Sequence, residues 1–134
     1  MGLALAGIGG RLIVGQSLEP ATPQWVKVGA ITELSSGEVH QAIYTVSQKD
    51  AWRTDEQKGS VYAYTEDGSN FVVLSATCSH LGCNVQWDGE AKQFYCPCHS
   101  GFFNRNGDVI SGPPPRPLAR LETKIEDGTL FAQI

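Results

Sequence analysis

Cysteine and histidine gather in one short part of this sequence. All four cysteines and two of the three histidines lie between positions 78 and 99. They form two groups, Cys78-Ser-His80-Leu-Gly-Cys83 and Cys96-Pro-Cys98-His99-Ser-Gly. Thiolate sulfur and imidazole nitrogen are ligands that zinc, copper and iron prefer in proteins. Such clustering predicts a metal site.

The spacing indicates which side chains could share one metal centre. The first group offers Cys-x-His, through Cys78 and His80. The second group offers Cys-x-x-His, through Cys96 and His99. The segment between them, residues 84–95, has the pattern of a hairpin, which would bring its two ends together. Two thiolates and two imidazoles would then meet at one end of a small sheet.

The residues alone leave several interpretations open. Zinc accepts two cysteines and two histidines, but its usual spacings begin with a cysteine pair and end with a histidine pair. A closed zinc site would also leave Cys83 and Cys98 unused. These two could instead form a disulfide that ties the two loops together. Alternatively, all four cysteines could form two structural disulfides, which would leave the histidines unexplained.

The remaining sequence predicts an all-β fold that positions these loops. Fifteen glycines and seven prolines, among short runs rich in β-branched and aromatic residues, are typical of short strands joined by tight turns. Residues 50–59 are polar and predict an exposed loop, and the three tryptophans are expected to pack rather than to take part in the chemistry. Strands are predicted at 25–28, 39–46, 60–65, 71–76, 84–87, 92–95, 118–125 and 129–134. Asp67-Gly68 predicts that the strands at 60–65 and 71–76 form a hairpin.

The 134 residues fit one domain, preceded by a different kind of segment. Residues 1–14 are apolar but interrupted by Arg11, too short to span a membrane alone. We expect residues 1–24 to be the remnant of a membrane anchor and a flexible linker that starts at Gly15; a core-packing or disordered arm is the alternative. The domain itself is expected to cover 25–134. A net charge of −4 argues against a nucleic-acid partner.

The two groups together resemble a known signature. Cys-x-His-Leu-Gly-Cys followed by Cys-Pro-Cys-His is similar to the motif of Rieske iron–sulfur proteins of the cytochrome bc type. The resemblance implies an antiparallel β-sandwich with a small cluster-binding subdomain inserted at about 74–119. It also implies a proline-rich loop over the cluster, formed by Gly112, Pro113, Pro114 and Pro115.

The same resemblance assigns the site residues. One [2Fe–2S] cluster would have Cys78 and Cys96 on one iron. His80 and His99 would bind the other iron. Cys83 and Cys98 would form a disulfide. Quinol would be contacted by His80, His99 and Leu81.

This ligand set has an electrostatic consequence. Two ferric ions, two sulfides and two thiolates sum to zero, because neutral imidazoles add no charge. An electron enters a neutral centre more easily than a negative one, so histidine ligation raises the reduction potential to about −150 to +300 mV. The second nitrogen of a ligating imidazole can also take up a proton after reduction. Such a centre suits the oxidation of a quinol.

The implied function is electron transfer within a membrane complex. The chain would accept an electron and a proton from a quinol at a cytochrome b subunit and pass the electron to a c-type cytochrome. It would be a subunit of a quinol:cytochrome c oxidoreductase, not catalytic alone, held by an N-terminal anchor. Disulfides persist outside the cytosol, so the domain is expected on the extracytoplasmic face. The alternative is the Rieske small subunit of a molybdenum oxidase such as arsenite oxidase.

The second group departs from the family pattern in a way that affects the potential. Many relatives continue with Gly-Ser-x-Tyr, whose hydroxyls donate to cluster or cysteine sulfur. Here the corresponding residues are Ser100, Gly101, Phe102 and Phe103. Without those donors, the reduced cluster is less stabilised and its potential falls. We therefore expect menaquinol to be the substrate, with Ser100 as a possible substitute donor.

Overall fold

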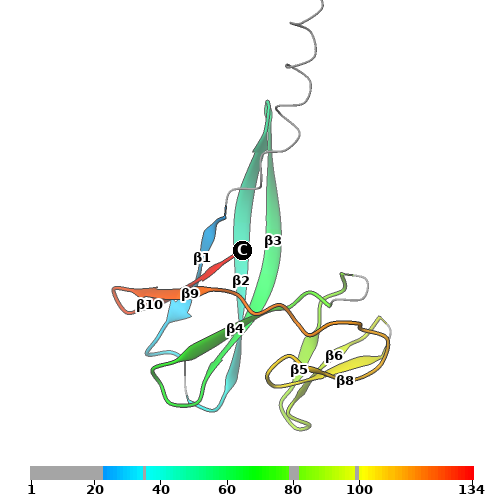
Figure 1. Ribbon diagram of the computed structural model, residues 1–134. Coiled ribbons are helices and arrows are strands. Elements are labelled where there is room, and N and C mark those ends of the chain that lie inside the picture. The colour runs from blue at the N-terminus through cyan, green and yellow to red at the C-terminus, as the bar shows by residue number, and fades with distance from the viewer. Residues whose placement is uncertain (1–22, 35, 79–81, 99) are drawn as a thin grey trace, which may run out of the picture.

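The computed structural model describes residues 23–34, 36–78, 82–98 and 100–134, and these ranges contain strands and turns but no helix (Figure 1). The all-β prediction is therefore confirmed. The strands are β1 (Trp25–Ala30), β2 (Val39–Asp50), β3 (Arg53–Thr65), β4 (Phe71–Ser75), β5 (Gln86–Asp88), β6 (Gln93–Cys96), β7 (Gly101–Asn104), β8 (Val109–Ser111), β9 (Thr123–Glu126) and β10 (Thr129–Gln133).

The strands form three antiparallel sheets, and two of them pack together as a sandwich. One sheet has the order β1-β10-β9 and a second has the order β2-β3-β4. They share a core in which Val61 and Val73 from the second sheet meet Val26 and Leu130 from the first. Because each strand buries alternate side chains, two sheets packed in this way give the expected sandwich.

A third sheet, in the order β5-β6-β7-β8, lies at the opposite end of the molecule from the tip of the β2–β3 hairpin (Figure 1). The chain leaves the sandwich after β4 and returns through a bridge between Leu74 and Arg120. The amide of Ser75 also donates a hydrogen bond to the carbonyl oxygen of Ala119, at 2.8 Å. Both connections to the third sheet are therefore held together where they leave the sandwich.

Two buried tyrosines fasten the third sheet to the sandwich. The Tyr62 hydroxyl donates to the carbonyl oxygen of Val85 at 3.0 Å, and the Tyr64 hydroxyl donates to Oδ1 of Asn106 at 2.7 Å. The guanidinium of Arg105 lies over the Tyr64 ring, with 4.6 Å between its Cζ atom and the ring centroid. Burial raises the pKa of both tyrosines, so their hydroxyls stay protonated as donors.

The prediction of an exposed loop at residues 50–59 is wrong. The register of β2 and β3 runs without a break from Val39 opposite Tyr64 to Asp50 opposite Arg53, so residues 53–59 belong to a strand. This part of the hairpin is exposed on both faces, and a ribbon without a buried face shows no apolar alternation in its sequence. Trp52, expected to pack, lies exposed in the turn.

Three other strand assignments also differ from expectation. The predicted strand at 118–125 is reduced to β9, because Arg120 makes only an isolated bridge and Leu121 donates its amide to the carbonyl oxygen of Val73. β7 and β8 were not predicted. Both are short, and β7 begins within the second cysteine–histidine group while β8 follows the turn after it, so glycine and polar residues conceal the alternation. The two predicted hairpins at 60–76 and 84–95 are confirmed.

Within the described ranges, no helix has the length and apolar character needed to cross a bilayer. Residues 1–22 lie outside those ranges, so the predicted division into an anchor remnant with linker (1–24) and a domain (25–134) stays a prediction.

Substitution of Gly107 tests how tightly the third sheet is packed on the sandwich. Its φ is +89°, and a Cβ atom there would lie 3.2–3.3 Å from side-chain atoms of Leu118 and Leu74. We expect Gly107→Ala to lower the free energy of unfolding by about 2–3 kcal/mol, from backbone strain plus overpacking. Gly128 has a φ of +71° with open space around it, so Gly128→Ala should cost only about 1 kcal/mol. Urea unfolding of both variants measures the difference, and equal costs would contradict the packing.

Candidate metal centre

The first cysteine loop is closed at its base by backbone hydrogen bonds. A bridge pairs Thr77 with Asn84, and the amide of Cys78 donates to the carbonyl oxygen of Cys83 at 2.6 Å. The amide of Gly82 donates back to the carbonyl oxygen of Cys78 at 3.1 Å. Gly82 has a φ of +71°, a conformation that glycine adopts without steric cost. Cys78 and Cys83 are thus fixed at the two ends of a tight loop.

The second cysteine loop connects β6 to β7. Cys96 and Gly101 are paired in the antiparallel register, so the loop between them begins and ends at adjacent positions. Ser100 has a φ of +55° and is exposed. A non-glycine residue with this φ is uncommon and is found mostly in turns such as this one. The ladder of β6 and β7 therefore sets the position of Cys96 from one side.

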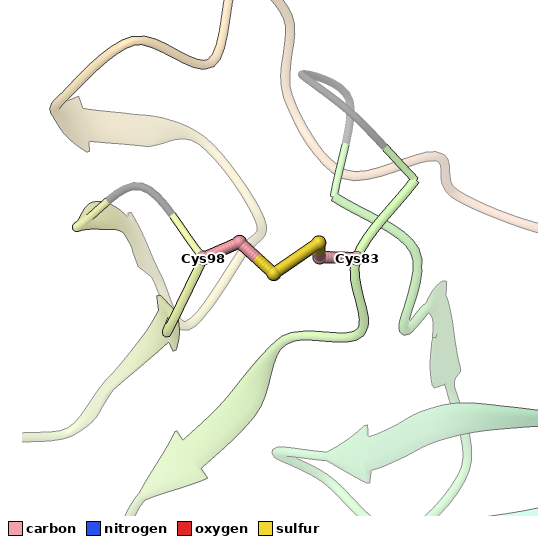
Figure 2. The surroundings of a disulfide bond; sticks show 2 residues. All are labelled: Cys83 and Cys98. Atoms are coloured by element: carbon pink, nitrogen blue, oxygen red, sulfur yellow. A yellow bond between two sulfur atoms is a disulfide. The ribbon is translucent and has the colours of Figure 1, made fainter.

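A disulfide joins the two loops. Cys83 and Cys98 are bonded, with 6.5 Å between their Cα atoms, and Figure 2 shows them facing each other from separate loops. The sulfur of Cys96 lies within 4.8 Å of both disulfide sulfurs. The residues alone offered this pairing as one alternative and the family resemblance implied it, and the structure contains it.

The two other cysteines lie beneath the disulfide. Cys78 and Cys96 are buried and are not part of it. Both belong to the hydrophobic core under the third sheet, together with Phe94 and Phe103. Each loop thus supplies one buried cysteine outside the disulfide, and thiolates are the usual protein ligands of iron–sulfur clusters.

The predicted histidine ligands cannot be placed. His80, Leu81 and His99 lie outside the described residues, so their assignment as ligands and quinol contacts stays a prediction. Their described neighbours Gly82 and Cys98 are exposed, as is Ser100.

The proline-rich loop packs directly against the second cysteine loop. Gly112 has a φ of +98°, and a Cβ atom there would lie 2.7 Å from the Cα atom of Gly101 and 2.8 Å from the carbonyl oxygen of Ser100. A Cβ atom on Gly101 would lie 2.6 Å from Cγ of Pro114, which is buried. The sequence did not reveal this contact. It explains why glycine, rather than a serine that could donate to sulfur, occupies position 101.

Phe103 lies in an aromatic core below both cysteine loops. It is fully buried and stands opposite Phe94 in the register of β6 and β7. The Phe94 ring in turn contacts Tyr62 edge-on, with 4.9 Å between ring centroids, and Trp87 at 4.7 Å. Trp87 therefore packs as expected. The ring of Phe103 offers no hydroxyl, so it packs without donating a hydrogen bond.

The comparisons with known proteins agree on one family. Residues 24–122 match the family model described as the Rieske [2Fe-2S] domain. The chain is 32% identical over 143 aligned positions to the menaquinol:cytochrome c reductase iron-sulfur subunit of Geobacillus thermodenitrificans, covering 95% of this chain and 84% of that one. It is 36% identical to the protein of the same name from Bacillus subtilis, covering 79% and 65%. The cytochrome b6-f complex iron-sulfur subunit of Chlorobaculum tepidum is 40% identical over 57% of this chain and 46% of its own length.

Solved structures share the fold. The cyanobacterial plasma membrane Rieske protein PetC3 from Synechocystis PCC 6803 has a TM-score of 0.57 at 24% identity, covering 81% of this chain and 99% of its own. A chain of a hyperthermophilic respiratory Complex III has a TM-score of 0.51 at 28% identity, covering 78% and 72%.

The chain therefore belongs to the Rieske [2Fe–2S] family, and its cofactor is one [2Fe–2S] cluster. This assignment excludes the zinc alternative. The alternative of two structural disulfides is also wrong, since Cys78 and Cys96 lie outside the single bond between Cys83 and Cys98.

Removing the disulfide tests its role in holding the loops together. We expect the double variant Cys83→Ser/Cys98→Ser, which leaves no new thiol to compete for iron, to lose about 3 kcal/mol of stability, as estimated for closing a loop of 15 residues. Its cluster absorption should also disappear at a lower temperature. Wild-type protein treated with a reductant that opens the bond is the control and should behave in the same way. An unchanged thermal loss of the cluster would contradict this role.

Proposed function

We propose that this chain is the electron-transfer subunit of a quinol:cytochrome c oxidoreductase of the cytochrome bc type. It takes an electron and a proton from a quinol at a cytochrome b subunit and passes the electron to a c-type cytochrome, without being catalytic alone. The observation that carries the proposal is the pair of disulfide-linked cysteine loops, in a chain that matches a menaquinol:cytochrome c reductase iron–sulfur subunit over 95% of its length.

The described residues support exchange of electrons at the loop tips. When bound, a [2Fe–2S] cluster with mixed sulfur and nitrogen ligation supplies a one-electron acceptor of raised potential. The two cysteines are held on the buried side, where Cys78 and Cys96 contact the core. Gly82, Cys98 and Ser100, next to the predicted ligands in sequence, are exposed. Exposed loop residues on a rigid sheet are suited to contact successive partners.

The residues around the second loop favour menaquinol over a higher-potential quinol. Neither Gly101 nor Phe103 carries a hydroxyl, and Pro114 already occupies the space that a side chain at 101 would need. A cluster with fewer hydrogen-bond donors to its sulfurs has a lower potential, because the added negative charge of the reduced state is less stabilised. A low-potential acceptor matches a low-potential quinol.

We further propose that residues 1–24 tether the domain to a membrane on its extracytoplasmic side. The disulfide supports this location, because such bonds persist in oxidising compartments and are rare in the cytosol. The linker from Gly15 to Gln24, with two prolines, would let the domain reach both cytochromes.

Purification of the intact complex tests the proposal. The chain, tagged at its C-terminus in the cell that makes it and extracted from membranes with mild detergent, should co-purify with b-type and c-type haem and reduce cytochrome c with menaquinol. Co-purification with a molybdenum subunit and no haem b would contradict it and favour the oxidase alternative.

A single hydroxyl tests the tuning of the potential. We expect Phe103→Tyr to raise the reduction potential by about 20–60 mV, if one hydrogen bond contributes about 0.5–1.5 kcal/mol and 59 mV corresponds to about 1.4 kcal/mol for one electron. Phe102→Tyr is the matched control, because neighbouring residues of β7 point to opposite faces of the sheet. Protein-film voltammetry measures both, and a Phe103→Tyr potential equal to that of wild type would contradict the account.

A further inference from the structure

The β2–β3 hairpin extends well beyond the sandwich. β4 pairs with β3 only along residues 61–65, so the rest of the hairpin is a ribbon of two strands. Val46 is the last residue of β2 that packs on the sandwich core, and residues 51–58 are exposed. Figure 1 shows this ribbon projecting from the domain as a finger. Two-stranded ribbons are only marginally stable in water, so this one is expected to have a contact outside the domain.

The tip of the finger, residues 49–54, combines an aromatic ring with positive charge. Trp52 is 94% exposed, and its turn is made possible by Ala51, which has a φ of +51°. Lys49 and Arg53 flank the tryptophan, and Asp50 is the one acid of the tip, so residues 49–54 carry a net charge of +1. Asp55, Glu56 and Lys58 follow on β3, so the positive charge is confined to the tip and residues 47–58 together are neutral. Tryptophan with neighbouring lysine or arginine is the combination enriched where proteins meet lipid headgroups.

The finger points to the side from which the chain enters the domain. In Figure 1 its tip lies away from β5–β8, on the side where β1 begins at Trp25. The finger extends about 17 Å past Val46, because residues 47–51 each add about 3.3 Å to an extended strand. The ten-residue linker at 15–24 can span at most about 35 Å. A tether of that length allows the tip to reach the surface in which an anchor ends.

The polarity of the ribbon argues against a protein partner. Along one face, the register pairs Ser47 with Glu56 and Lys49 with Thr54, and all four are exposed. The large exposed hydrophobic residues of the ribbon are Trp52 at the tip and Ile43 (73% exposed) near its base on β2. A stable protein interface buries about 800 Å² on each side around an apolar centre, which these two separated side chains do not provide.

We propose that the tip of the β2–β3 hairpin is a membrane contact, which places Trp52 in the headgroup region of an anionic bilayer. The inference rests on the proposed function in one respect, that the chain before β1 holds the domain at a membrane. Lys49 and Arg53 would face the negative surface, where each cation is attracted by the anionic lipids. The contact would determine which side of the domain faces the bilayer while the cluster end stays free.

Fluorescence of tethered protein tests the contact. The full, cluster-loaded chain with a histidine tag before Met1 is bound to vesicles of equal parts phosphatidylcholine and phosphatidylglycerol with a little nickel-chelating lipid. The emission of Trp52 is obtained by subtracting that of Trp52→Phe. On vesicles it should shift to the blue and lose about half its intensity when the phosphatidylcholine is brominated, as for a ring at headgroup depth.

Matched variants identify what causes the quenching. Lys49→Gln/Arg53→Gln should reduce the quenching, and so should vesicles without phosphatidylglycerol. Lys92→Gln, at the β5–β6 turn, removes one positive charge at the other end of the domain and should leave the quenching unchanged, whereas Lys49→Gln alone, which also removes one, should reduce it. Ile110→Ala, which trims another exposed apolar side chain (54%) on β8, should also leave it unchanged.

Two results would overturn the inference. Trp52 emission on vesicles that equals its emission in solution, with no effect of bromine, would show that the tip does not touch lipid. A blue shift that grows with protein density and ignores bromine would show that the tip binds a second copy instead. Because the tag replaces the anchor, either result would leave the proposed electron-transfer role standing, and failure of that role would not alter this readout.

Discussion

The four cysteines of the site come from two loops that are separated in sequence, so the site depends on holding those loops side by side. The bond between Cys83 and Cys98 does this covalently. Backbone hydrogen bonds at the base of each loop add to this. The pairing of Cys78 with Cys83 closes one loop, and the pairing of Cys96 with Gly101 closes the other. The described cysteines are thus held by a covalent bond and by backbone pairing, and a metal site needs such support for its ligands.

The sandwich gives these loops a rigid base. Buried tyrosines, Tyr62 and Tyr64, reach from β3 into the third sheet and donate hydrogen bonds to it, and their neighbours pack in one aromatic core with Phe94. The same packing sets the chemistry of the second loop. Pro114 lies against Gly101, so the contact that covers the loop also excludes a hydroxyl-bearing side chain there. In the proposed function, the lowered reduction potential would share its origin with this structural support.

The sequence was sufficient for those features that depend on local pattern. Alternating strands with Asp67-Gly68 between two of them predicted a hairpin that the structure contains, and the cysteine spacing matched a family whose disulfide is present. The sequence was not sufficient where a strand has no buried face, or where a contact joins residues that are brought together by the tertiary fold. The outer β2–β3 ribbon has no buried face, and therefore no apolar period to reveal it. The contact of Pro114 with Gly101 joins residues whose meeting depends on the whole third sheet. The ligand roles of His80 and His99 stay predictions.

Pulsed EPR of the reduced protein, combined with iron and acid-labile sulfide analysis, tests the central claim that the cluster has two sulfur and two nitrogen ligands. The account predicts two irons and two sulfides per chain, with magnetic coupling from two nitrogens that is lost when His80 or His99 is replaced. A single zinc ion without sulfide, or an iron–sulfur signal with no nitrogen coupling, would contradict it.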